Sequence, residues 1–149
     1  MAQAQDEMAA DPAGEQPGRF GFDLPELELH LSEVSLQLGD HDQGRAHART
    51  SQAAKNIGGP GWAAATLALA RGEVARRRFA DAAALAADVL DTCPPASIRE
   101  TSRARLRDLD RDLFTTAAPG SEARDLRERI RTLPALVPVG QLSDEPNGV

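Results

Sequence analysis

The sequence is poor in aromatic residues and in β-branched runs. Aromatic residues make up 3% of the 149 residues, with four Phe, one Trp and no Tyr. The volume of a folded core must therefore come mainly from Leu, Ala, Val and Ile, and alanine has the highest helix propensity. The absence of β-branched runs argues against a sheet. Together these absences predict an all-α protein.

The single cysteine and the lack of long apolar stretches bear on where the protein works. Cys93 cannot form an intramolecular disulfide, which indicates a reducing compartment. The longest largely apolar run, residues 62–70, is too short to cross a bilayer. The N-terminal residues lack the basic and apolar regions of a secretion signal. We therefore expect a cytoplasmic protein with no membrane partner.

Charge is unevenly distributed along the chain. The formal net charge is −6, but residues 1–42 carry ten acidic residues and one basic residue, and the remainder carries 13 acidic and 16 basic residues. The acidic N-terminal part argues against direct nucleic-acid binding, because such binding depends on neutralising phosphates. The slight basic excess of the remainder is typical of solvated helix faces.

Composition divides the chain into three segments. Residues 1–22, an acidic leader, and residues 138–149 mix glycine, proline and polar residues without a hydrophobic period, and we expect both to be disordered. Residues 23–137 carry helical periodicity and are predicted to form one helical domain.

Six helices are predicted in this domain, separated by breaks rich in glycine or proline. The fifth should begin with a capping box formed by Ser97 and Glu100. The short connections predict antiparallel αα-hairpins. The predicted helices span residues 25–38, 42–57, 62–77, 80–91, 97–114 and 121–133.

Apolar spacing predicts which face of each helix is buried. The first two stripes are Leu27, Leu31, Val34 and Leu38, and then Ala46, Thr50, Ala53 and Ile57, with the small Gly44 and Ala48 facing a close neighbour. The third and fourth are Trp62, Ala65, Leu69 and Gly72 or Glu73, and then Ala82, Ala83, Ala86, Val89 and Leu90. The last two are Ile98, Ser102, Leu106, Leu109 and Leu113, and then Leu126, Ile130 and Leu133.

A helix pair at residues 61–95 has a looser copy at residues 23–57, and a unit used more than once indicates a helical repeat. In the upstream copy Gly39 precedes a turn, and the small Gly44 and Ala48 follow it. The downstream copy carries Phe79, Ala82, Ala86, Val89 and Pro94. This pattern resembles the tetratricopeptide repeat. The resemblance implies a solenoid of antiparallel αα-hairpin repeats, with three hairpins from six helices.

The alanine-rich hairpin is followed by a double proline and an Arg-rich helix, SIRETSRARLRDLDRDL. This order is similar to the C-terminal helical half of bacterial Xre-type helix-turn-helix transcriptional regulators. In that family the DNA-reading domain precedes the repeats, and residues 1–22 are too few and too acidic to contain it. The resemblance implies an interaction or sensor half that works in transcriptional regulation without a DNA-binding domain.

The resemblance to the tetratricopeptide repeat also implies a binding groove, lined by the first helix of each pair. The corresponding residues are Glu26, Leu29, Glu33, Leu36, Leu67, Arg71 and Val74. Their leucines and valine form a second apolar line, which either the adjacent hairpin or a partner must cover. A protein or peptide in this groove is one interpretation of that line, and a homodimer is another.

Three consecutive arginines, Arg76, Arg77 and Arg78, close the third predicted helix. Basic residues near a helix C-terminus are stabilising, typically by about 0.3–1 kcal/mol each. Alternative roles are recognition of an acidic partner or phosphate, or of the acidic segment 1–42. Trp62 is interpreted as a core residue, with a partner anchor as the alternative.

No group of residues indicates catalysis, a metal site or a cofactor. The histidines His30, His41 and His47 lack the spacing of ligands on one helix face, and Cys93 has no base close in sequence. Residues 58–61, GGPG, lack the lysine and Ser/Thr of a phosphate-binding loop. We therefore expect a non-catalytic protein- or peptide-interaction module, with a homo-oligomerisation module or a small-ligand sensor as alternatives.

Overall fold

The computed structural model describes residues 23–116 and 119–136 of the protein. These residues form six α-helices, one short 3₁₀ helix and no strand, so the all-α prediction is confirmed. The segments predicted to be disordered, residues 1–22 and 138–149, lie outside the described residues. The helices are α2 (Leu24–Gln37), α3 (His41–Ala53), α4 (Pro60–Ala75), α5 (Phe79–Thr92), η1 (Pro95–Ser97), α6 (Glu100–Thr116) and α7 (Ser121–Arg131).

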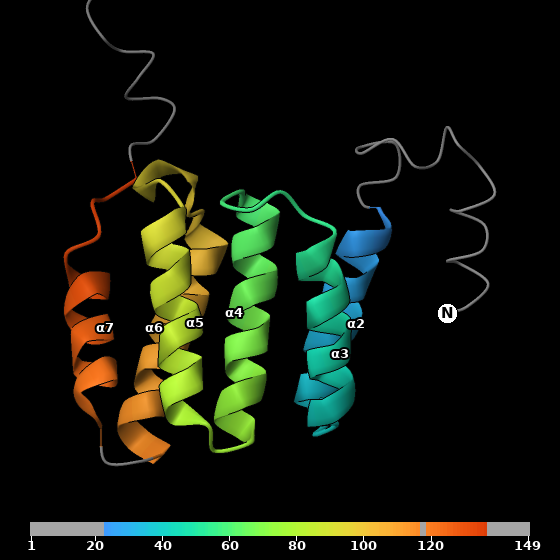
Figure 1. The fold of residues 1–149 in the computed structure, drawn as a ribbon, viewed down its shortest axis with the longest axis horizontal. Helices are drawn as coiled ribbons and strands as arrows, with labels where there is room; N and C mark the ends of the chain where they lie inside the picture. The colour runs from blue at the N-terminus through green and yellow to red at the C-terminus, as the bar shows by residue number, and fades with distance from the viewer. Residues whose placement is uncertain (1–22, 117–118, 137–149) are drawn as a thin grey trace, which may run out of the picture.

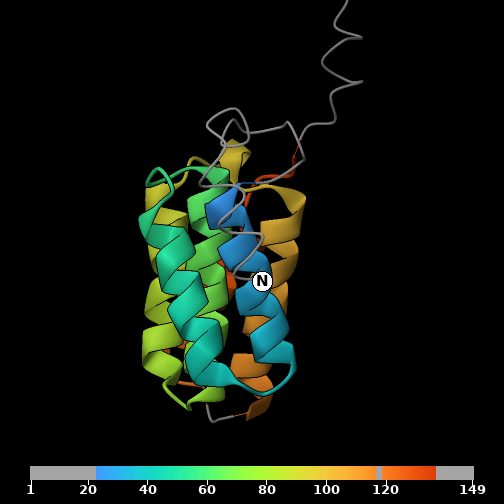
Figure 2. The same ribbon diagram turned by 90° about the vertical axis from the view of Figure 1, so that its right-hand side faces the viewer.

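The helices stand side by side, with their axes close to one common direction (Figure 1). Helix α4 lies at the centre and packs against α2, α3, α5 and α6, while α7 packs against α5 and α6. Seen from the N-terminal end, α2 and α6 lie on one side of α4 and α3 and α5 on the other (Figure 2). Helix α4 therefore has one side that faces α2 and α6 and another that faces α3 and α5.

Helix α4 is buried on all of its sides along residues 62–70. The predicted stripe of Trp62, Ala65 and Leu69 is buried, but so are the residues between them. A helix surrounded by other helices needs no polar face, which explains the lack of a distinct stripe. Thr66 is tolerated there because its hydroxyl donates to the Trp62 carbonyl at 2.8 Å and accepts from Gln52 Nε2 at 2.8 Å.

Small residues allow neighbouring helices to approach closely, as predicted. Gly44 and Ala48 of α3 are buried, and a Cβ added at Gly44 would lie 2.7 Å from Leu36 Cγ. Ser32 Oγ donates to the Gly44 carbonyl at 2.6 Å across the same contact. In α5, Ala82 and Ala86 are fully buried in the core, which confirms the prediction for this helix.

The stripes predicted for the first two helices are wrong except at Leu31, which is buried. Val34 and Leu38 are 50% and 80% exposed and Ile57 is 77% exposed, while Ala46, Thr50 and Ala53 also face solvent. The residues buried beside Leu31 in α2 are Leu29, Ser32 and Leu36, and those buried in α3 are Gly44, Ala48 and Ser51. Apolar spacing does not predict these two faces in full, because each of them contains a buried serine. Their hydroxyls bond backbone carbonyls, Ser51 to Pro25 at 2.7 Å, and this allows their burial.

The capping box predicted for the fifth helix is also wrong. Ser97 lies in η1 and its hydroxyl donates to the Pro94 carbonyl at 2.8 Å, and α6 begins at Glu100. Arg103 of α6 ties this turn to the segment after α7. Its guanidinium, in a side chain that is 8% exposed overall, donates to the carbonyls of Pro95, Ile98 and Pro134 at 2.6–2.9 Å.

The close packing of α5 gives a direct test of the core. We expect Ala86→Phe to lower the free energy of unfolding by about 1–3 kcal/mol, because the fully buried site has no room for a ring. Urea unfolding followed by circular dichroism measures this change. Ala84→Phe on the exposed side of the same helix is the control and should cost below about 0.5 kcal/mol. Equal stability of the two variants would contradict this packing.

The Arg103 guanidinium gives a second test of the fold. We expect Arg103→Lys to cost about 1–3 kcal/mol, because an ammonium cannot reproduce the planar fork that bonds three carbonyls. Arg107→Lys, at an exposed position of the same helix, should change stability by less than about 0.5 kcal/mol. Thermal unfolding of both variants checks the difference, and an unaffected Arg103→Lys would show that the three bonds contribute little.

Candidate functional site

Helices α2, α4 and α6 together line a hollow of about 400 Å³. Four of the predicted groove residues lie there, namely Glu33, Leu36, Leu67 and Arg71. The apolar part of the lining comes from Leu36, Leu67, Ala68 and Leu109, which are all buried by the chain itself. The hollow therefore combines an apolar floor with charged side chains.

The other predicted residues lie apart from this hollow. Glu26 and Leu29 line a second hollow, of about 560 Å³, which also takes residues from the N-terminal parts of α4 and α6. Val74 is partly buried and packs against the largest core cluster. Arg105 lines both hollows, so the two adjoin each other at this side chain.

An ion pair joins α6 to α2 at the boundary between the hollows. Glu33 Oε1 accepts from Arg105 Nε at 3.1 Å and from Nη2 at 2.5 Å. Both side chains are about 30% exposed, so water screens the pair and its net contribution to stability is small. Charged groups of a bound partner can therefore compete for either side chain at low cost.

The remaining charges of the first hollow are partly unsatisfied. Arg71 is exposed and has no hydrogen-bond or ion-pair partner among the described residues. On α6, Arg111 pairs with Asp108 at 2.9 Å, and Asp112 also lines the hollow. The lining contains neither histidine nor cysteine. Its chemistry therefore suits recognition of apolar and charged groups.

Sequence reasoning misses the contribution of α6 to this hollow. Apolar spacing places Leu109 in the core stripe and indicates no role for Arg105 or Asp112. The resemblance to a repeat ends at residue 95, so it cannot place α6 beside α2. The regular Arg and Asp spacing of α6 is a signal of a charged helix face, but it does not identify what that face adjoins.

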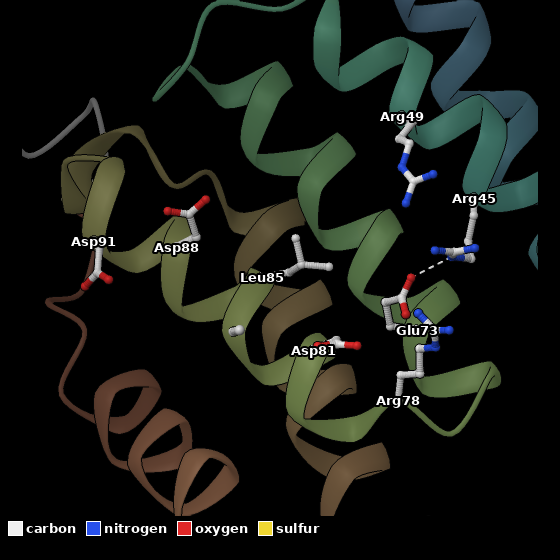
Figure 3. Close-up of a pocket in the computed structure, with 9 residues that line it drawn as sticks. Arg45, Arg49, Glu73, Arg78, Asp81, Leu85, Asp88 and Asp91 are labelled. Atoms are coloured by element: carbon white, nitrogen blue, oxygen red, sulfur yellow. Dashed lines mark hydrogen bonds and ion pairs between the residues drawn. The ribbon is translucent and has the colours of Figure 1, made fainter.

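A cleft on the other side of α4, between α3 and α5, is also missed by the sequence pattern (Figure 3). It has a volume of about 510 Å³ and takes Arg45 and Arg49 from α3 and Asp81 from α5. Glu73 of α4 lies at its floor, 5% exposed, and Glu73 Oε1 accepts from Arg45 Nε at 2.6 Å. The cleft is therefore lined mainly by charged residues.

The three consecutive arginines do not form one site. Helix α4 ends at Ala75, and Arg77 adopts a left-handed conformation with φ +61°. Arg76 pairs with Asp42 at 3.4 Å, Arg77 lies 5.6 Å from the ring centre of Phe79, and Arg78 lines the cleft between α3 and α5. The turn directs the three side chains to separate surroundings.

The described residues contain no group of three or more His, Cys, Asp or Glu side chains that could hold a metal ion. His47 Nδ1 lies 2.5 Å from Glu28 Oε2. Trp62 is buried in the core. Cys93 is buried, and this burial, followed by the nearby charge of Asp88, raises the pKa of its thiol.

Comparisons with protein-family models, with curated proteins and with solved structures find no match to this chain. None of the helices in the described residues is long and apolar enough to cross a membrane.

The environment of Cys93 predicts a slowly reacting thiol. Its raised pKa keeps the thiol neutral over a wider pH range, and only the thiolate is a strong nucleophile. We expect a thiol reagent at pH 8 to modify the native protein more slowly than the protein unfolded in urea. Cys93→Ser combined with Thr92→Cys places a cysteine at the exposed neighbouring position and should react rapidly when native. Equal rates for the two native proteins would contradict burial of Cys93.

Proposed function

We propose that this protein is a non-catalytic interaction module that binds a protein or peptide on the face formed by α2, α4 and α6. The hollow beside Leu67 and Arg71 is the observation that carries this proposal, because it combines an apolar floor with a guanidinium that is unpaired within the described residues. Such a surface can accept an apolar side chain and bond a nearby acidic or carbonyl group. Its charged groups bond and orient the partner, while Leu36, Leu67 and Leu109, at 3–7% exposure, offer it only a small apolar contact.

We further propose that the helices form three antiparallel hairpins, α2–α3, α4–α5 and α6–α7, stacked as in a tetratricopeptide-like solenoid. The order of the contacts supports this arrangement, since α4 packs against α2 and α6, and α5 packs against α7. The first helices of the three hairpins would then line one face, as the groove of a repeat protein requires.

A role in transcriptional regulation is the expected setting. It rests on the resemblance of the Ala-rich hairpin, Pro94-Pro95 and the Arg-rich helix to the C-terminal half of Xre-type regulators. In this setting the module would bind a protein partner. The second apolar line gives a homodimer little support, because Leu29, Leu36 and Leu67 are covered by the chain's own helices. Homo-oligomerisation and small-ligand sensing are the alternative functions.

Peptide selection followed by mutation tests the proposed surface. Peptides are selected from a random display library on the full chain, and their dissociation constants are then measured by fluorescence anisotropy. We expect Arg71→Glu to weaken the selected peptides by about tenfold or more, which corresponds to roughly 1.4 kcal/mol, because the substitution reverses a charge beside the apolar floor. Arg71 is exposed, so this variant should keep the wild-type melting temperature.

Arg124→Glu is the matched control, since it makes the same charge change at an exposed position of α7 outside this hollow and outside the cleft between α3 and α5. The proposal requires that the selected peptides bind Arg124→Glu as tightly as the wild type. Selected peptides that bind Arg71→Glu unchanged would remove the α2, α4 and α6 face from consideration. Failure of the chain to select any peptide would count against an interaction module of this kind.

A further inference from the structure

The cleft between α3 and α5 has walls of opposite charge. Arg45 and Arg49 lie four residues apart on one side of α3. Asp81 and Asp88 lie seven residues apart on the facing side of α5 (Figure 3). Arg78, in the turn before α5, adds a third guanidinium to the basic side.

The floor of the cleft contains a buried carboxylate oxygen without a donor. Glu73 Oε1 accepts from Arg45 Nε, but Glu73 Oε2 is buried and has no hydrogen-bond partner among the described residues. A desolvated carboxylate oxygen is unfavourable unless a donor reaches it. The last side-chain torsion of glutamate is soft, so a small rotation can turn this oxygen toward the cleft.

Other charged groups around the cleft are also available. Arg49, Arg78 and Asp81 are exposed and have no hydrogen-bond or ion-pair partner for their side chains among residues 23–116 and 119–136. By contrast, Asp91 at the far end of the cleft pairs with Arg129 of α7 at 2.6 Å. The available groups are thus two guanidiniums, one exposed carboxylate and the buried oxygen of Glu73.

This combination favours a ligand with both charges over a simple ion. A phosphate or another anion at Arg49 and Arg78 would leave Asp81 and Glu73 Oε2 without a donor, and a metal cation at the carboxylates would leave the two arginines unpaired. A ligand that carries both charges satisfies every available group. The cleft is widely open to solvent, which suits a protein surface better than an enclosed small molecule.

We propose that the cleft between α3 and α5 is a second binding site, which takes a partner helix carrying acidic and basic residues four positions apart. The acidic side chain of the partner bonds Arg49 and Arg78. Its Arg or Lys side chain enters beside Asp81 and donates to Glu73 Oε2. A pair of opposite charges at this spacing lies on one helix face and so can meet both walls together.

This site is separate from the face proposed above, because the cleft and the hollow of α2, α4 and α6 share no lining residue. Residues of α4 contribute to both, but Arg71 and Glu73 point to different sides of that helix, two positions apart. The chain can therefore hold two partners at once, and the two proposals can fail independently.

Two synthetic helical peptides test the second site. Both are alanine-based; one carries Glu and Arg pairs four residues apart, and the other has Gln at all of these positions. Each is titrated into the ¹⁵N-labelled full chain, and amide chemical shifts are recorded. We expect the charged peptide to shift amides of α3 and α5 and to bind about tenfold or more tightly than the neutral peptide.

Variants on the two walls complete the test. Arg49→Glu and Asp81→Arg each place a like charge against the peptide, so each should weaken the charged peptide by about tenfold or more. Both positions are exposed, and retention of the wild-type spectrum elsewhere checks the fold. Arg71→Glu is the control and should leave this binding unchanged.

Equal binding of the charged and neutral peptides would overturn the proposal, as would shifts confined to α2, α6 and α7. Binding that survives both wall variants would also overturn it. Loss of binding in Arg71→Glu but not in the wall variants would place the charged peptide on the other face.

Discussion

The structure depends on the burial of α4 among four other helices. Its residues 62–70 are mostly alanine, and Ala63, Ala65 and Ala70 have no exposed surface. Larger side chains at these positions would push α2, α3, α5 or α6 away, and the core would lose contacts on every side. Helix α5 follows the same rule with Ala82 and Ala86. Close backbone approach therefore compensates for the small number of aromatic residues in this chain.

The same packing creates both candidate surfaces. Beyond its fully buried stretch, α4 presents Arg71 toward α2 and α6, and Glu73 toward α3 and α5. Arg71 and Glu73 are two residues apart, which is slightly more than half a helical turn, so their side chains lie on nearly opposite sides of α4. One side has an apolar floor with charges at its edge, and the other has charges on both walls and on the floor. The two surfaces consequently favour partners of different chemistry.

The buried polar side chains of the core differ from Glu73 in how completely they are hydrogen-bonded. Ser32, Ser51, Thr66 and Arg103 are buried, and each donates a hydrogen bond to a backbone carbonyl. These bonds fix α2 against α3 and hold the turn before α6. Glu73 differs, because one of its oxygens has no donor within the described residues. A buried carboxylate oxygen without a donor, beside an open cleft, distinguishes Glu73 from these other residues.

The sequence by itself determined that the chain forms helices, where most of them break, and which faces of α5 and α6 are buried. It did so because Ala82, Ala86, Leu106 and Leu113 follow helical spacing and glycine or proline separates the segments. Only the tertiary structure decided the buried faces of α2 and α3, since Ser32 and Ser51 are buried through bonds to carbonyls distant in sequence. It also decided the sites, because Glu33 meets Arg105 and Arg45 meets Glu73 only after helices distant in sequence pack together.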